Sequence, residues 1–204
     1  MSNSTTPFGL RPVRYYNGAP WNGATQRMYI HALYDTALYV GDPVIQQEEL
    51  DEKDTSAHYP SIEKVAYSSA AIVESGPIMG VIVGFEPRPA DLTVTYMPAL
   101  TEGWAFVCTD PQVVYHIRDD GGGTPSKVYP GQNAALTDAG GSTVTGLSGF
   151  SMEATTPATT VTYPLHILQM ANIVGNELDD YAIWEVMLNT PWLTAGKILG
   201  VTAA

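Results

Sequence analysis

Short apolar runs, several of them bounded by glycine or proline, recur along the whole sequence. The chain has 19 glycines and 15 prolines among 204 residues. No segment shows a sustained helical period of 3.6 residues with capping residues at its ends. Because proline lacks a backbone donor and glycine weakens helix interiors, such a chain is poorly suited to long helices. The pattern predicts an all-β fold, a sandwich or barrel of short strands.

The expected strands share an enrichment in valine, isoleucine, tyrosine and phenylalanine. Their ranges are 26–31, 37–46, 62–67, 78–86, 104–110, 113–118, 142–147, 149–153, 160–169, 181–189 and 198–202. Residues 161–168 alternate between apolar and mostly polar side chains, which is typical of a strand with one buried face. Residues 180–188 alternate less clearly, and a strand buried on both faces would explain that pattern.

The first 34 residues differ from the rest in charge. They contain Arg11, Arg14 and Arg27 and no acidic residue, whereas the whole chain has a net charge of −12. Prolines, glycines and aromatic residues are mixed in the same segment, which disfavours both a helix and a free disordered tail. Residues 1–24 are therefore expected to form an extended N-terminal arm that docks on the chain's own body or on a neighbour.

The remaining residues, 25–204, are expected to form a single β domain. An acidic loop is expected at about 47–60, and loops rich in glycine, serine and threonine at about 119–160. Residues 128–196 contain no lysine or arginine and only six acidic residues. Because a fully solvated surface usually carries more charge, part of this stretch is expected to be buried between subunits or against a partner.

The composition also bears on possible partners. A net charge of −12 argues against direct nucleic-acid binding, which needs lysine and arginine to displace phosphate counterions. The longest apolar run, residues 78–85, suits a strand rather than a membrane helix, so no membrane partner is expected. The first residues lack the features of a signal peptide, and the single cysteine, Cys108, cannot form an internal disulfide. We expect folding in a reducing cytoplasm.

The sequence contains only weak candidates for a catalytic or metal-binding site. The histidines His31, His58, His116 and His166 lack zinc-ligand spacing. Cys108 with His116 and Asp110 allows a thiol triad, but the apolar, acidic surroundings favour a buried structural thiol. The pairs 119–120 and 179–180 are aspartates that allow calcium binding, although solvated turns explain them better. No catalytic residue, metal ligand or cofactor is expected, and the chain is interpreted as a non-enzyme.

Six segments, in their order and spacing, carry a resemblance to a known family. They are residues 6–14 (TPFGLRPVR), 18–23 (GAPWNG), 41–44 (GDPV), 80–87 (GVIVGFEP), 110–117 (DPQVVYHI) and 141–149 (GSTVTGLSG). Together they resemble the head decoration, or cement, proteins of tailed bacteriophages. The resemblance extends from about residue 6 to residue 190.

The resemblance implies a non-enzymatic virion structural protein. Such proteins sit on the outer capsid surface, often as trimers at three-fold or quasi-three-fold positions, and bridge neighbouring coat subunits. Several have jelly-roll-like β bodies, so a jelly-roll-like sandwich with an extended arm is expected. The implied partners are the major capsid protein and further copies of this chain, after assembly in the bacterial host cytoplasm.

A clamp of this kind needs buried contact area rather than a catalytic group. If the arm is the clamp, its aromatic, apolar and basic side chains are the candidate partner-binding residues. These residues are Phe8, Leu10, Arg11, Arg14, Tyr15, Tyr16 and Trp21. The arm could equally wrap its own body or a sister subunit. The alternative function is a receptor- or glycan-binding β module of a phage tail, in which Trp21, Trp104 and Trp192 would stack on sugar rings.

Overall fold

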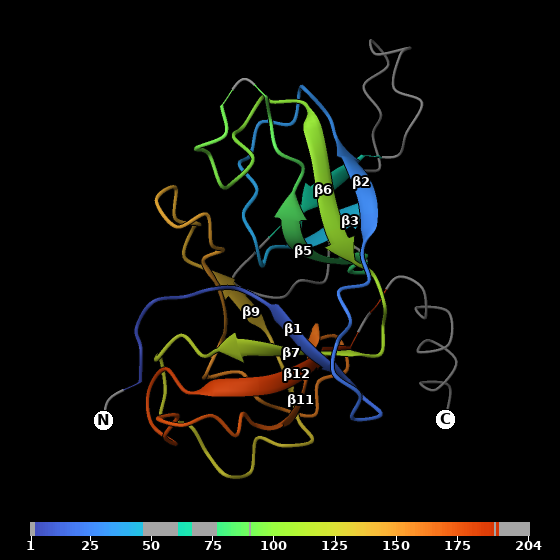
Figure 1. Ribbon diagram of the computed structural model, residues 1–204. Coiled ribbons are helices and arrows are strands. Elements are labelled where there is room, and N and C mark those ends of the chain that lie inside the picture. The colour runs from blue at the N-terminus through green and yellow to red at the C-terminus, as the bar shows by residue number, and fades with distance from the viewer. Residues whose placement is uncertain (1–2, 47–60, 67–76, 90, 190, 192–204) are drawn as a thin grey trace.

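The computed structural model describes residues 3–46, 61–66, 77–89, 91–189 and 191. Within these ranges the chain is all-β, and its named strands pair antiparallel (Figure 1). The strands are β1 Arg11–Tyr15, β2 Gln26–Ile30, β3 Pro43–Gln46, β4 Ile62–Lys64, β5 Gly80–Phe85, β6 Gly103–Cys108, β7 Val113–Arg118, β8 Asn133–Ala134, β9 Leu136–Asp138, β10 Phe150–Met152, β11 Leu165–Met170 and β12 Ile183–Leu188. Among the described residues there is no helix long and apolar enough to cross a bilayer.

The strands form two five-stranded sheets and one ribbon. The β2–β6 sheet has the order β2-β6-β5-β3-β4, and the β7–β12 sheet has the order β1-β7-β12-β11-β8. Strands β9 and β10 pair as a separate ribbon. Figure 1 shows the β2–β6 sheet in its upper half and β1, β7, β11 and β12 in its lower half.

The all-β prediction is confirmed, but the strand order is not that of a jelly roll. Consecutive strands of a jelly roll cross between its two sheets, whereas β2 to β6 all remain in one sheet here. Neighbours in sequence pair directly, as in β3 with β4, β5 with β6 and β11 with β12. The chain completes one sheet before it builds most of the other.

Some strand predictions differ from the structure for local reasons. Residues 142–147 form a turn, closed by a hydrogen bond from the Gly146 N–H to the Ser142 carbonyl oxygen, with φ of +71° at Gly146. The strand expected at 160–169 begins only at Leu165. The expected strand 198–202 and the acidic loop at about 47–60 lie outside the described residues.

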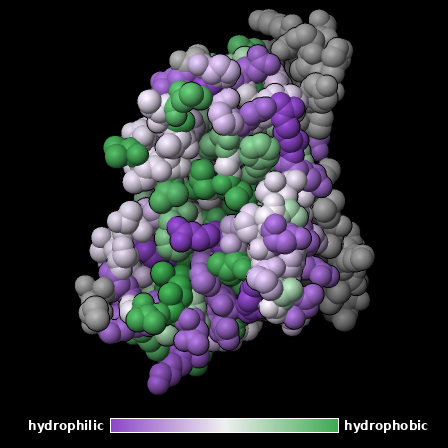
Figure 2. Space-filling model, viewed as in Figure 1, coloured by the Kyte–Doolittle hydropathy of each residue, from purple (hydrophilic) through white to green (hydrophobic). Residues whose placement is uncertain are grey.

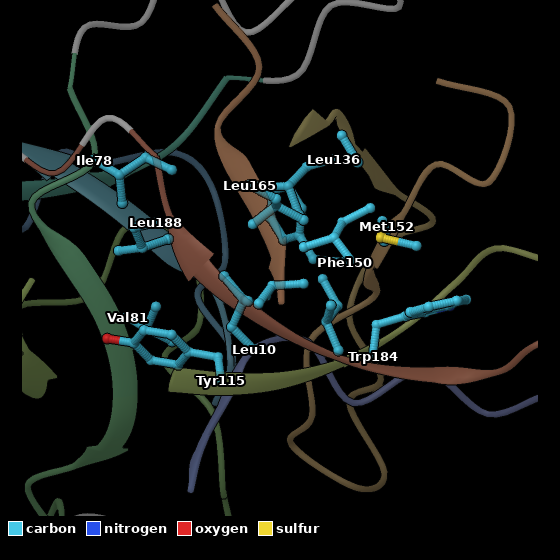
Figure 3. Packing of buried hydrophobic residues seen from close by; sticks show 14 of the residues in the cluster. Leu10, Ile78, Val81, Tyr115, Leu136, Phe150, Met152, Leu165, Trp184 and Leu188 are labelled. Carbon is cyan, nitrogen blue, oxygen red and sulfur yellow. The ribbon is translucent and has the colours of Figure 1, made fainter. Parts of the chain in front are cut away.

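Two clusters of buried hydrophobic side chains pack against the sheets. The larger one joins β7, β11 and β12 to the β9–β10 ribbon, and Figure 3 shows its side chains extending from Val81 and Tyr115 at one side to Met152 and Trp184 at the other, with Leu10 between them. The smaller one lies within the β2–β6 sheet. Because successive strand residues face opposite sides, Val81 contributes to the larger cluster and Ile82 to the smaller. The β2–β6 sheet therefore packs on both faces.

The N-terminal segment docks on the chain's own body. Strand β1 pairs with β7 at the edge of the β7–β12 sheet, with Arg11 opposite His116 and Tyr15 opposite Val113. The register shifts between Pro12 and Arg14, which lets a proline occupy the strand. Of the two placements expected for the arm, its own body is the one that the structure shows.

Candidate functional site

An apolar cavity of about 240 Å³ lies where the N-terminal segment meets the two sheets. Figure 2 shows hydrophobic side chains gathered in the middle of this face, between the upper and lower halves of the molecule. We call this apolar cavity the junction cavity. Its lining residues are Phe8, Leu10, Arg11, Pro12, Trp21, Val40, Ile82, Val83 and Leu147.

Two glycines allow the N-terminal segment to approach the β2–β6 sheet closely. Gly9 and Gly41 have φ values of +70° and +98°, in the left-handed region that favours glycine. A Cβ on Gly9 would lie 2.5 Å from the Gly41 carbonyl oxygen. The Leu10 N–H donates to that same oxygen at 3.0 Å. A larger residue at either position would separate the two backbones and open one wall of the junction cavity.

The other walls are held by backbone hydrogen bonds between distant loops. The Gly41 N–H donates to the Ile82 carbonyl oxygen at 2.8 Å, and the Val40 N–H donates to the Gly146 carbonyl oxygen at 2.9 Å. The Ser148 N–H returns a bond to the Val40 carbonyl oxygen at 2.9 Å. Four of the six resemblance segments thus contribute lining residues, and a fifth, 41–44, directly follows Val40.

The structure brings together four of the seven predicted partner-binding residues. Phe8, Leu10, Arg11 and Trp21 line the junction cavity. The Arg11 guanidinium lies 4.9 Å from the centroid of the Phe8 ring, a cation–π contact at an exposed position. Sequence reasoning did not find the opposite wall, formed in part by Val40, because only the fold places that residue beside the arm.

The prediction of Leu10 as a partner-binding residue does not fit its position in the structure. The side chain is 1% exposed and belongs to the larger hydrophobic cluster. A residue packed this deeply stabilises the chain's own fold and has almost no surface left to offer a partner. The sequence could not separate Leu10 from Phe8, because both are apolar residues in the same proline- and glycine-rich segment.

The other predicted residues lie away from the junction cavity. The Arg14 guanidinium donates to the Glu185 carboxylate at 2.6 Å, and Gln169 donates to the same oxygen at 3.0 Å. Burial raises the pKa of Glu185, but these bonds outweigh it, and the pKa lies below its usual range. The Tyr15 hydroxyl donates to Asn22 at 2.8 Å. Tyr16 is 64% exposed and remains available to a partner.

Cys108 and His116 do not form a thiol triad. The buried Cys108 sulfur accepts a hydrogen bond from the Tyr115 hydroxyl at 3.4 Å. His116 follows Tyr115 in β7 and faces the other side of the sheet, where its Nε2 lies 3.6 Å from the Glu185 carboxylate. Burial raises the pKa of the Cys108 thiol. The interpretation as a structural thiol agrees with this geometry.

Asp119 is a buried structural group rather than a solvated turn. Its Oδ1 accepts hydrogen bonds from the Gly121 and Tyr181 N–H groups at 3.0 and 2.7 Å, and its Oδ2 accepts one from Trp184 Nε1 at 3.2 Å. The described residues contain no group of three or more histidine, cysteine or acidic side chains arranged to hold a metal ion.

Trp104 is partly covered on its ring face. The Arg27 guanidinium lies 3.8 Å from the ring centroid, and Arg27 is itself paired with Glu86. Tyr29 packs edge-on against the same ring with centroids 5.3 Å apart. A sugar stacking on this face of Trp104 would have to displace Arg27. Trp192 lies outside the described residues.

No protein-family model matches this chain, and neither the curated proteins nor the solved structures contain a match to it.

Proposed function

We propose that the chain is a non-enzymatic structural protein of a phage virion. In this proposal it decorates the outer surface of the head and clamps neighbouring major capsid subunits, most effectively as a homotrimer. The supporting observation is the convergence of the resemblance segments on one apolar cavity with a basic edge. Residues that lie far apart in the chain are held there by backbone hydrogen bonds, so the surface is preorganised.

The junction cavity suits contact with a coat subunit. Phe8 and Trp21 are aromatic, and aromatic residues dominate the binding energy of protein interfaces. Arg11 lies beside Phe8 and provides positive charge on a chain whose net charge is −12. An apolar side chain of the coat protein would enter the cavity, and acidic coat residues would face Arg11.

Co-sedimentation with purified heads of the encoding phage tests this function. The wild-type chain should migrate with mature heads, and Phe8→Ala should weaken binding about 30-fold, as expected for an interface anchor. Arg11→Ala is a second variant at an exposed position, so it should weaken binding without lowering the unfolding temperature. Val174→Ala is the control, because Val174 is fully exposed and does not line the cavity.

Two results would count against the proposal. Wild-type protein that stays in the supernatant at every head concentration would end the virion role. Binding that both cavity variants and the Val174 control leave unchanged would keep the role but move the contact away from the junction cavity.

A further inference from the structure

The connection from β11 to β12 encloses the side chain of Asn3, at the beginning of the N-terminal segment. Its Nδ2 group donates to the carbonyl oxygens of Glu177, Asp179 and Asp180 at 3.0, 3.3 and 3.0 Å. The Glu177 N–H donates in turn to Asn3 Oδ1 at 3.0 Å. Asn3 is only 9% exposed, although the three residues that follow it are exposed. We call the backbone groups of residues 177–180 the amide cradle.

The amide cradle is held in shape by hydrogen bonds that do not involve its occupant. Asn176 Nδ2 donates to the Ala171 and Ile183 carbonyl oxygens at 2.8 and 2.9 Å, and its Oδ1 accepts from the Ile183 N–H at 2.9 Å. Tyr181, directly after the cradle, has φ of +66°, a left-handed conformation that is costly for a tyrosine. Its N–H donates to Asp119 Oδ1 at 2.7 Å. The loop is therefore preorganised, and residues in such costly conformations cluster at ligand-binding sites.

The donors and acceptors of the cradle fit one chemical class of ligand. The three carbonyl oxygens need a donor, which a carboxylate lacks. The Glu177 N–H needs an acceptor, which an ammonium group or a metal ion lacks. A primary carboxamide carries two N–H donors beside one carbonyl acceptor, so it satisfies both sides at once. The cradle therefore selects an asparagine side chain over an aspartate of the same shape.

Arg118 holds the chain between the amide cradle and the junction cavity. Its guanidinium donates to the Thr5 carbonyl oxygen and lies 4.7 Å from the centroid of the Tyr181 ring. Phe8 follows three residues after Thr5, at the junction cavity. Figure 1 shows this segment in blue, on the same side of the molecule as the connection from β11 to β12. The cradle thus holds the far end of the segment that carries Phe8.

We propose that the amide cradle is a binding site for a primary carboxamide, and that Asn3 is the ligand through which it positions Phe8 at the junction cavity. The first part stands on the hydrogen bonds of the cradle alone. The second part rests on the proposed virion function, because that function assigns Phe8 to the contact with the coat. Loss of the Asn3 bonds would release the exposed residues 4–6 and let Phe8 move away from the cavity.

Chemical rescue of the full-length Asn3→Gly variant tests the carboxamide site. The substitution removes the side chain and leaves the cradle without its ligand. Acetamide has four non-hydrogen atoms, so it should bind with a dissociation constant of about 1–100 mM and shift the amide resonance of Glu177 in NMR spectra. Acetate and methylammonium should not, and wild type should not respond to acetamide. Equal responses to acetamide and acetate, or none to acetamide, would overturn the site.

Asn3→Asp in the full-length chain tests the positioning. It keeps the size of the side chain but turns a donor into a charged acceptor that faces three carbonyl oxygens. Chymotrypsin should cut the released segment after Phe8 about tenfold faster than in wild type. Asn17→Asp is the matched control, because it adds the same charge and its Oδ1 can accept from the Ala19 N–H in either form. Unchanged cleavage of Asn3→Asp would overturn the cradle as the anchor of the segment.

Head binding connects the cradle to the proposed function. Asn3→Asp should bind purified heads about tenfold more weakly than Asn17→Asp, with the same urea denaturation, since Asn3 lies outside both hydrophobic clusters. A merely structural role would change both measurements together. Heads that bind Asn3→Asp as tightly as wild type would overturn the positioning of Phe8. Heads that do not bind wild type would end the virion role and the assignment of Phe8, whereas the carboxamide site would stand on the acetamide result.

Discussion

Two fully buried aspartates, in different regions of the molecule, differ in how completely their carboxylate oxygens are hydrogen-bonded. Asp119, at the end of β7, accepts three hydrogen bonds that use both of its oxygens. Asp42, beside the junction of the two sheets, is stabilised by the Tyr39 N–H and by a hydrogen bond with the Ser148 side chain, and its Oδ1 has no partner among the described residues. Burial raises the pKa of both carboxyl groups. The difference therefore lies in what surrounds each carboxylate rather than in how deeply it is buried.

The contrast separates a carboxylate with both oxygens hydrogen-bonded from one that keeps an oxygen without a partner among the described residues. The donors to Asp119 come from loops and strands of the same sheet, and they fix the chain around Trp184. The charges of two residues from different pairs of strands act on Asp42 in opposite directions: Lys64 lowers its pKa and Asp138 raises it. Buried polar groups are normally satisfied, so the unpaired oxygen of Asp42 adds to the energetic cost of keeping this carboxyl group ionised in the fold.

The largest expected effect is at Asp119. Asp119→Ala would leave two backbone N–H groups and the Trp184 indole N–H buried without their acceptor. We expect a loss of about 4 kcal/mol in the free energy of unfolding. Urea denaturation measures it, and Asp180→Ala, at an exposed neighbouring acid, should change stability by less than about 0.5 kcal/mol. Similar losses in both variants would remove the structural role assigned to Asp119.

At neutral pH, removal of the Asp42 charge should have the opposite effect on stability, because it should stabilise the fold. The folded-state pKa of about 6 lies above the usual 3.8, so the ionised group destabilises the fold above pH 6, and the penalty fades as the pH falls from 6 to about 4. Asp42→Asn should therefore raise stability at pH 8 by up to about 3 kcal/mol and have little effect at pH 4.

The measurement is urea denaturation of wild type and Asp42→Asn at both pH values. An Asp42→Asn effect of equal size at pH 4 and pH 8 would mean that the Asp42 charge is fully compensated in the fold. The two aspartates would then differ only in their hydrogen bonds, not in the energy of their charged forms.

The smallest effect is expected at Glu185, a carboxylate held by a partner at the sheet edge. Arg14→Ala should lower stability at pH 7 by about 1 kcal/mol, because the ion pair is only partly buried and Gln169 still binds Glu185. The pKa of Glu185 is lowered, so its contribution exists above pH 4.5 and disappears as the pH falls through the folded-state value.

Acid denaturation of wild type and Arg14→Ala checks this, with Arg27→Ala as the matched control. The Arg27–Glu86 pair is about half exposed, so its loss should cost less than that of the Arg14 pair. Equal effects for the two arginines would show that burial of Glu185 adds nothing to its ion pair.

Strand β7 shows how much of the fold could be predicted from the sequence. Its predicted range, 113–118, agrees with the structure because a β-branched run there lies between two turn-forming segments. Strand β1 was not predicted, since Pro12 argues against a strand. Its place at the sheet edge and the irregularity after Pro12 remove that objection, and both are tertiary features.

The candidate sites divide in the same way. The aromatic and basic residues of the arm could be selected from composition, and three of them, Phe8, Arg11 and Trp21, line the junction cavity. Val40 and Leu147 on its other walls could not, because their role depends on loops that meet only in the folded chain. The amide cradle had no sequence signal, since Asn3 and residues 177–180 share no motif or spacing.

The sequence by itself determined the all-β class, because turn chemistry and strand patterning act over a few neighbouring residues. The tertiary structure decided which glycine-rich loops meet, whether Leu10 faces the core or a partner, and which buried charges lie together. These outcomes depend on packing between segments far apart in the chain. Asp42 and Asp119 are the same residue type, and only the fold gave Asp119 three donors while leaving one oxygen of Asp42 without a partner among the described residues.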